Sequence, residues 1–209
     1  MVGEAAKRLV MPSFRIVCLV GGLTACSSLP DRVKLPPTAG EQEALYGIAG
    51  WSLNGRVAVK INGESWQASL VWQHAATQDK LRLSGPLGVG AVDVYLTDHY
   101  MRLVGADGEV ESSFQPDSLM KERLGFPVPL KDLEFWVLGL PSLDSSKYQI
   151  VETYESGRIK AMIQSGWQIG YKDFRQVGQW ILPGKIIVVR GAARLVLVAD
   201  QWDFDGSQI

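Results

Sequence analysis

Residues that could perform acid–base or metal chemistry are sparse in this sequence. It holds only two histidines, His74 and His99, and each lies beside turn-like sequence, which predicts solvated loops. Asp93 and Asp98 could act together as acid and base, but only their proximity in the sequence supports that pairing. The motifs G-x-S-x-G, H-E-x-x-H and C-x-x-C are all missing. We therefore expect no catalytic residues and no metal ligands.

Three closely spaced glycines, Gly85, Gly88 and Gly90, superficially suggest a loop that binds phosphate. Such a loop needs the N-terminus of a helix behind it, because the free backbone N–H groups of that helix bind the anion. The residues that follow here alternate as a strand does, with Val92 and Val94 apolar. A P-loop motif is missing as well, so the sequence predicts neither nucleotide hydrolysis nor a cofactor.

Cys26 is the one residue whose surroundings indicate a specific covalent modification. Basic residues precede an apolar run over residues 16–22, and Leu23-Thr24-Ala25-Cys26 follows, which is the order of a secretory signal. The last four residues resemble the lipobox of bacterial lipoproteins. That resemblance implies a diacylglyceryl group on the thiol, cleavage before Cys26 and acylation of the new N-terminus. Ser27 stands where aspartate would favour inner-membrane retention, so the expected location is the periplasmic face of the outer membrane.

Removal of residues 1–25 as a signal peptide changes what the composition allows. The whole chain has a formal charge of −1 and its first 25 residues carry +2, which leaves −3 on the mature chain. That charge gives no electrostatic case for nucleic acid as a partner. Cys18 leaves with the signal, so neither a disulfide nor a cysteine metal site is possible within the mature chain. The remaining length suits one domain, which we expect to be a monomer.

The rest of the chain divides into a tether and one domain. Residues 26–50 are predicted to form the lipidated N-terminus, a tether rich in proline and serine, and a short helix. From Trp51 to the C-terminus, apolar residues alternate with polar ones in short runs, which predicts strands joined by hairpins. About ten strands are expected, near residues 51–61, 66–73, 81–83, 92–96, 101–103, 148–154, 158–164, 167–171, 185–189 and 195–202.

Helices are expected near residues 119–124 and 129–138, where the alternation is interrupted. A long antiparallel sheet tends to curl. Two or three helices are too few to cover both of its faces, so they are expected to lie on the concave face as a lid. An apolar cavity would then separate lid and sheet.

Apolar and aromatic side chains are the remaining candidates for a functional site. The sequence has seven tryptophans, which could either fill an ordinary core or line a cavity for acyl chains. The sequence does not distinguish the two for the inward-facing candidates Leu70, Trp72, Leu83, Val94 and Trp136.

The stretch Gly85-Pro86-Leu87-Gly88-Val89 is predicted to be a hairpin tip, because Pro86 cannot donate a hydrogen bond to a sheet and glycines flank it. Turn tips are usually polar, whereas this one is uncharged and carries Leu87. It could either fold over the core or project as an apolar tip toward a membrane or a hydrophobic client.

Several short motifs in this order resemble the LolB family of outer-membrane lipoproteins over nearly the whole mature chain. Besides the lipobox, they are Gly55-Arg56-Val57-Ala58, Leu70-Val71-Trp72-Gln73, Leu83-Ser84-Gly85-Pro86-Leu87-Gly88, Gly125-Phe126-Pro127-Val128-Pro129-Leu130, Trp136-Val137-Leu138-Gly139-Leu140-Pro141, Leu182-Pro183 and the strand from Leu195 to Trp202. One departure is the ten residues before Met11, since a start at Met11 would leave the signal intact.

The resemblance implies an open antiparallel β-barrel of about ten or eleven strands, with helices plugging its mouth. It implies a protein that accepts lipoproteins from the periplasmic carrier LolA and inserts them into the inner leaflet of the outer membrane. Pro86, Leu87 and Gly88 would form the membrane-insertion loop. An alternative is a structural outer-membrane lipoprotein that scaffolds an assembly complex and needs no cavity. An enzyme acting on lipids would need a nucleophile and base that the sequence does not offer.

Overall fold

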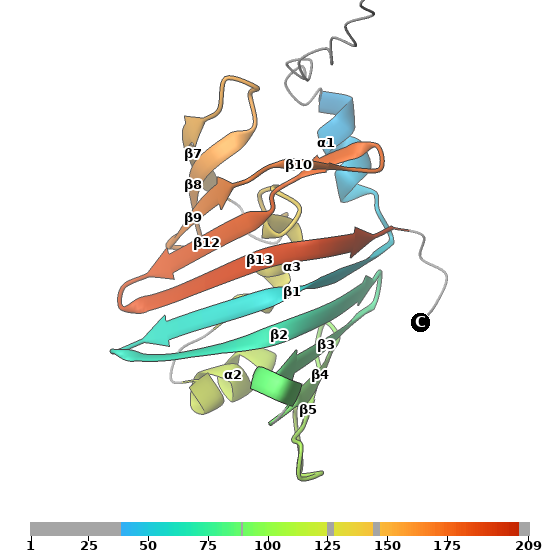
Figure 1. Ribbon diagram of the computed structural model, residues 1–209, viewed down its shortest axis with the longest axis vertical. Helices are drawn as coiled ribbons and strands as arrows, with labels where there is room; N and C mark the ends of the chain where they lie inside the picture. The colour runs from blue at the N-terminus through green and yellow to red at the C-terminus, as the bar shows by residue number, and fades with distance from the viewer. Residues whose placement is uncertain (1–38, 89, 125–127, 144–146, 205–209) are drawn as a thin grey trace, which may run out of the picture. The chain divides into compact units, whose positions relative to one another are not determined.

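The computed structural model describes residues 39–88, 90–124, 128–143 and 147–204, so Cys26 and the predicted signal lie outside the described residues. An eleven-stranded antiparallel sheet dominates, in the order β6-β5-β4-β3-β2-β1-β13-β12-β9-β8-β7 (Figure 1). Its strands are β1 Gly50–Ile61, β2 Glu64–Ala75, β3 Gln78–Ser84, β4 Val92–Leu96, β5 Met101–Val104, β6 Val110–Ser113, β7 Tyr148–Thr153, β8 Ile159–Gln164, β9 Trp167–Lys172, β12 Lys185–Arg190 and β13 Ala193–Asp203.

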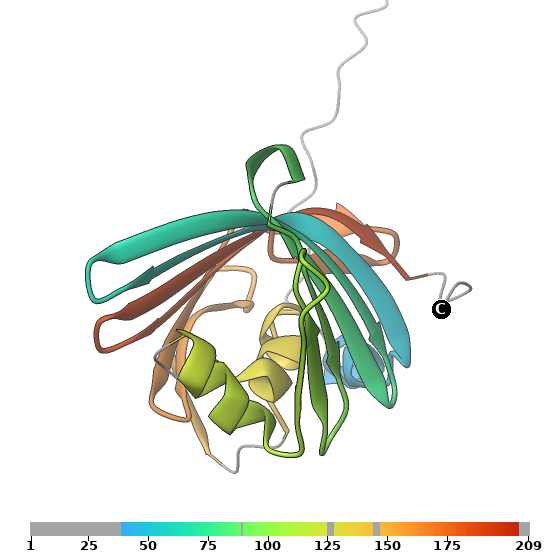
Figure 2. The same ribbon diagram turned by 90° about the horizontal axis from the view of Figure 1, so that it is seen from below.

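The sheet is not closed, because β6 and β7 stand at opposite ends of the strand order and do not pair with each other. It curves strongly, and the helices lie on its concave side (Figure 2). They are α1 Ala39–Tyr46, α2 Pro116–Leu124 and α3 Leu130–Trp136. The predicted fold class, a mainly β protein with a few helices and an open antiparallel barrel, is therefore confirmed. Among the described residues, no helix is long and apolar enough to cross a membrane.

The central strands form as the alternation predicts. Trp51, Leu53, Gly55, Val57 and Val59 are buried along β1, and the residues that alternate with them are exposed or half-buried. The turn from β1 to β2 holds Asn62 and Gly63 at φ 48° and 94°, the left-handed values that a two-residue hairpin turn requires. The register of β1 against β13 shifts between Asn54 and Gly55.

Gly55 is required at that shift for a steric reason. A Cβ atom at this position would lie 2.3 Å from the carbonyl oxygen of Val198 on β13, far inside van der Waals contact. Since backbone atoms cannot yield as a flexible side chain can, the close approach of the two strands depends on glycine.

A polar bridge fixes α3 against the sheet. Trp136 is fully buried, and its indole Nε1 donates a hydrogen bond of 2.9 Å to Oε1 of Gln164 on β8. The same amide accepts 2.8 Å from the backbone N–H of Ser142 and donates 2.8 Å to its carbonyl oxygen. Because every polar atom of the buried Gln164 side chain is bonded, the bridge holds α3 and the following loop in one position.

Two features are absent from the expected strands: the short edge strand β6 and a hairpin after β9. The chain between β9 and β12 forms a separate two-stranded hairpin, β10 Arg175–Val177 with β11 Trp180–Leu182. Strands of three residues are too short for alternation to be recognised.

Candidate functional site

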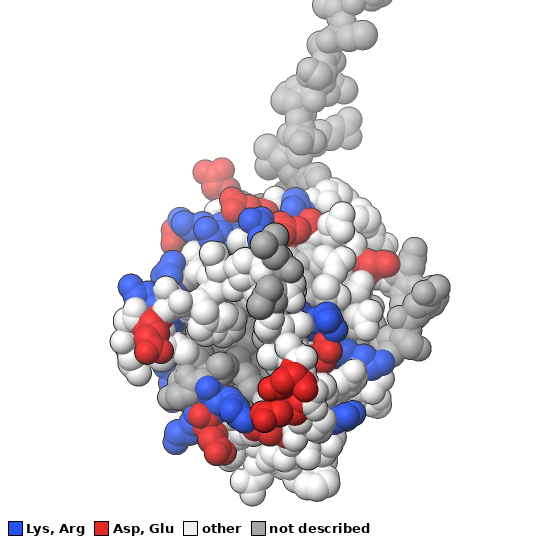
Figure 3. All heavy atoms as spheres, turned by 60° about the horizontal axis from the view of Figure 1, so that its bottom comes forward, with Lys and Arg blue, Asp and Glu red and all other residues white. Residues whose placement is uncertain are grey.

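The main cavity lies between the sheet and α2. It measures about 650 Å³. Charged side chains of both signs lie around the hollow on the face in Figure 3, whereas much of the surface beside it is uncharged. The cavity is lined by β2 to β5, by the loops that follow β3 and β5, and by α2, with apolar contributions from Trp66, Ala68, Leu83, Ala91, Val92, Val94, Leu103 and Met120.

One strand shows why the space is open here. On the inward face of β2, Trp72 and Leu70 are 2% and 3% exposed, because large side chains fill the space beneath them. Two residues further along the same face stands Ala68, half-buried, and then Trp66, which is 38% exposed. The change from large side chains to alanine turns a filled core into an apolar cavity.

A charged rim borders the cavity on the side of β6 and α2. Asp107, Glu109 and Glu111 contribute to its lining together with Arg123. The Nε atom of Arg123 donates a hydrogen bond of 2.7 Å to Oε2 of Glu111, which connects α2 to β6. Both side chains are substantially exposed, so this ion pair contributes little stability. The helix over the cavity is therefore held less firmly than α3.

The structure separates the five predicted cavity residues. Leu83 and Val94 line the cavity. Leu70, Trp72 and Trp136 belong to the packed core and are not among the lining residues. Trp72 donates a hydrogen bond of 2.7 Å from its indole to Oδ1 of Asp79, as buried structural tryptophans commonly do. Acyl binding by any of the five stays a prediction.

Sequence reasoning missed other residues of the lining, among them Ala68, Val92, Leu103 and Met120. The first three face inward in strands, and their alternation was visible. An apolar cavity between lid and sheet was expected, but its position and extent were not, because alternation indicates which face is inward and says nothing of how well that face is filled.

The predicted hairpin tip is a single turn of 3-10 helix, η1 Pro86–Gly88, between β3 and β4. The N–H of Gly88 donates 3.0 Å to the carbonyl oxygen of Gly85, and Gly88 has φ 77°, a value that favours glycine. Pro86 lies beside Arg56, Gln67 and other outward residues of the sheet, so the turn stands on the convex face (Figure 2). Of the residues predicted for membrane insertion, Pro86 and Gly88 are exposed, and the side chain of Leu87 lies outside the described part.

The acid–base pair considered for Asp93 and Asp98 does not form. Asp93 pairs with Arg82 at 3.0 Å, and Asp98 pairs with Lys131 at 3.3 Å. His99 is exposed in a turn, as expected.

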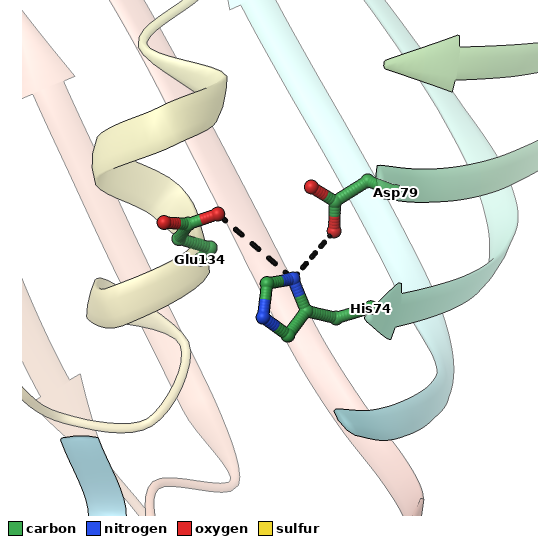
Figure 4. A group of neighbouring side chains, drawn as sticks. All are labelled: His74, Asp79 and Glu134. Atoms are coloured by element: carbon green, nitrogen blue, oxygen red, sulfur yellow. Dashed lines mark hydrogen bonds and ion pairs between the residues drawn. The ribbon is translucent and has the colours of Figure 1, made fainter. Parts of the chain in front are cut away.

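His74 does not lie in a solvated loop, and that expectation was wrong. It stands near the end of β2 with its side chain 15% exposed, and its ring stacks on Trp51 with centroids 5.0 Å apart. Its Nδ1 lies 2.9 Å from Oδ1 of Asp79 and 3.9 Å from Oε2 of Glu134 (Figure 4). Burial by itself would lower the pKa of His74, but the hydrogen bond to Asp79 and the two carboxylate charges raise it above its ordinary value.

Comparison with known proteins shows the family to which this sequence belongs. The model of the family described as outer membrane lipoprotein LolB matches residues 49–202. The chain belongs to the LolB family. It is 34% identical to the outer-membrane lipoprotein LolB of Nitrosococcus oceani over 77% of this chain and 80% of that protein. It is 29% identical to the LolB protein of Chromohalobacter salexigens over 90% and 86% of the two chains.

Among solved structures, a DUF1329 family protein from Desulfovibrio piger is similar with a TM-score of 0.46 and 10% identity, over 84% of this chain and 96% of that one. A likeness this distant does not inform the site.

Proposed function

We propose that this chain is an outer-membrane lipoprotein acceptor, which takes the acyl chains of a client lipoprotein from the periplasmic carrier LolA and releases them into the inner leaflet of the outer membrane. The observation that carries the proposal is the apolar cavity of about 650 Å³ beneath α2 in a chain of the LolB family. A cavity of this size lies within the range of roughly 300–1,000 Å³ that is usual for small-molecule sites.

The transfer needs no covalent chemistry. Each acyl methylene removed from water contributes about 0.8 kcal/mol, so an acyl chain must stay covered at every step of its passage across the periplasm. Since the sequence has no nucleotide-hydrolysis motif, transfer can run only downhill. The cavity must hold acyl chains more tightly than the carrier does and less tightly than the bilayer. The alanines and the partly exposed Trp66 in its lining support such an intermediate affinity, because they leave the space imperfectly filled.

The helix α2 is the element best suited to admit an acyl chain. Among its described side chains, the buried Leu119 and the half-buried Met120 contact the rest of the domain, and Arg123 forms the exposed ion pair with Glu111. Displacement of α2 would open the cavity, while the bridge through Gln164 keeps α3 in place. The movement therefore displaces α2 and leaves α3 in place.

Residence in the membrane is assigned to a different part of the chain. In this proposal residues 1–25 are a signal peptide, residues 26–50 carry the lipid on Cys26 and the tether, and residues 51–209 form one lipid-binding domain. The monomeric protein would stand on the periplasmic face of the outer membrane. Leu87, in an uncharged turn on the convex face, would contact the bilayer, where one leucine contributes about 1.5–3 kcal/mol. That is too little to anchor the protein and enough to orient a tethered one.

The test is an assay that scores carrier-to-protein and protein-to-liposome transfer separately. Ala68→Trp fills the cavity from the inward face of β2, and Ser69→Trp places the same side chain on the exposed outward face of that strand as a control. We expect Ala68→Trp to abolish uptake from the carrier and Ser69→Trp to retain it, with both proteins folded. Equal uptake by both would contradict the proposal, and would favour a scaffold lipoprotein that needs no cavity.

A further inference from the structure

We propose that His74, Asp79 and Glu134 form a binding site for a divalent transition metal ion, with zinc as the best-matched ion. The three residues come from separate elements, namely the end of β2, the start of β3 and the middle of α3 (Figure 4). Each offers one potential ligand atom, and these atoms all lie within 4.8 Å of one another. The site lies outside the lining of the apolar cavity and plays no part in the proposed acyl transfer.

The distances between the ligand atoms fit a small metal ion. Nδ1 of His74 lies 2.9 Å from Oδ1 of Asp79 and 3.9 Å from Oε2 of Glu134, and one ligand atom of each residue lies within 4.8 Å of those of the other two. Three atoms that all lie within 4.8 Å of one another share a point no more than about 2.8 Å from each of them. Zinc bonds to nitrogen and carboxylate oxygen are roughly 2.0–2.2 Å long, so side-chain shifts of less than about 1 Å complete the coordination.

The ligand types favour zinc over the harder cations. One imidazole nitrogen with two carboxylate oxygens is a set that suits zinc and its neighbours in the first transition row. Calcium takes six to eight oxygen ligands, and magnesium keeps several of its waters in an octahedron. Neither of these ions would gain from the imidazole.

Neighbouring side chains hold two of the ligands in position. The indole Nε1 of Trp72 donates a hydrogen bond of 2.7 Å to Oδ1 of Asp79, which fixes the carboxylate. Trp51 stacks on the ring of His74 with an interplanar angle of 24° and fixes its plane. Such outer contacts orient the ligands of metal sites and strengthen binding.

The site has an access path and room for a water ligand. His74, Asp79 and Glu134 all border a second cavity, of about 310 Å³, together with Asp98 and Lys131. Lys131 pairs with Asp98 at 3.3 Å, so its ammonium group is drawn to that carboxylate. A fourth ligand from water would complete a tetrahedron on the cavity side.

A metal ion here would join α3 to β2 and β3. The helix is already bridged to β8 through Gln164, and the new bonds would tie it to the other half of the sheet. Because metal binds the folded arrangement and not the separated ligands, zinc would raise the melting temperature of the protein.

The experiment titrates zinc chloride into the full chain, purified in detergent without a histidine tag, at about pH 8, where a neutral imidazole can act as a ligand. Calorimetry gives the affinity and differential scanning fluorimetry gives the melting temperature. The variants are His74→Ala, Glu134→Gln, which keeps the size of the side chain and removes its charge, and His99→Ala as the matched control at the exposed histidine.

We expect one zinc ion per chain and a higher melting temperature in the wild type and in His99→Ala. Affinity should fall at least ten-fold in His74→Ala and in Glu134→Gln. Zinc-edge X-ray absorption of the wild-type protein, expected to show nitrogen and oxygen ligands only, supplies a readout that does not depend on the folding of the variants. No saturable binding to the wild type, or equal affinity in wild type and His74→Ala, would overturn the proposal and leave the three residues as an ion pair between helix and sheet.

Discussion

The two lid helices lie under one curved sheet and are held in different ways. Helix α3 buries Leu133 and Trp136 and is bonded through Gln164 and through the contact of Glu134 with His74. In helix α2, the described side chains that hold it are Leu119 and Met120, which pack on the core, and Arg123 in an exposed ion pair. The packing of the concave face of the sheet differs in the same way. Large side chains fill it at Trp72, whereas alanine leaves it open at Ala68.

The difference shows how one small domain can be stable and still hold an exchangeable ligand. The stability comes from the packed end of the domain, around Trp72 and Trp136, where burial and satisfied polar groups act together. The hollow end, around Ala68 and Trp66, contributes less to stability. An acyl chain can therefore replace weak contacts there without unfolding the domain. Substitutions at the two ends should therefore have different consequences, which three comparisons test; a fourth tests the turn on the convex face.

The largest difference is expected from a buried charge. Leu70→Glu places an unpaired carboxylate in the packed core, which costs several kcal/mol, and the protein should not fold. Leu103→Glu places the same group in the half-buried lining of the cavity, where water can reach it. That variant should fold and lose binding of a fluorescent fatty acid. Circular dichroism measures the folding of both variants, and titration with the fatty acid measures binding. An unfolded Leu103→Glu would show that the hollow end is also part of the core.

Removing tryptophans from the two ends should give the next largest difference. Trp136→Ala loses a fully buried side chain and its hydrogen bond to Gln164, which should lower the free energy of unfolding by about 3–5 kcal/mol. Trp66→Ala removes a side chain that is 38% exposed at the cavity, and should cost about 1 kcal/mol or less. Chemical denaturation measures both values. Equal losses would remove the distinction between the packed and hollow ends.

A smaller effect is expected where α2 meets β6. Arg123→Ala breaks the exposed ion pair with Glu111 and should change the free energy of unfolding by less than about 1 kcal/mol. It should nevertheless speed the release of a bound fluorescent fatty acid, because the helix over the cavity loses a contact. Arg82→Ala, which breaks a similar exposed pair with Asp93, is the control and should leave release unchanged. Stopped-flow displacement gives both rates, and identical rates would separate α2 from ligand release.

The smallest effect on stability is expected at the turn after β3. Leu87→Glu should leave folding and uptake from the carrier nearly intact and block delivery into liposomes, because a charge opposes contact of the turn with the bilayer. Val71→Glu, at an exposed apolar residue on β2, is the control and should deliver normally. A loss of uptake in Leu87→Glu would mean that Leu87 contacts the carrier instead. Equal delivery by both variants would remove the turn from the mechanism.

Most of the sheet could be predicted from local patterns, because each strand buries one face and the turns at Asn62 and Gly63 are explicit. The division of the concave face into core and cavity could not be predicted, since Leu70 and Ala68 both face inward in the alternation and the pattern does not show what packs across from each of them. The cluster at His74 was hidden for a related reason. Glu134 lies sixty positions away in the sequence and approaches His74 only because α3 packs against the sheet.

The central claim is that the cavity beneath α2 receives the acyl chains of a client. The most direct measurement places a photo-crosslinking amino acid on β3 at Leu83, which lines the cavity, or at the neighbouring Arg82, whose side chain is exposed. Each protein is then mixed with carrier loaded with a client whose acyl chains are radiolabelled. We predict a labelled crosslink from position 83 and none from position 82. Crosslinks from position 82 alone, or equal crosslinks from both positions, would contradict the claim.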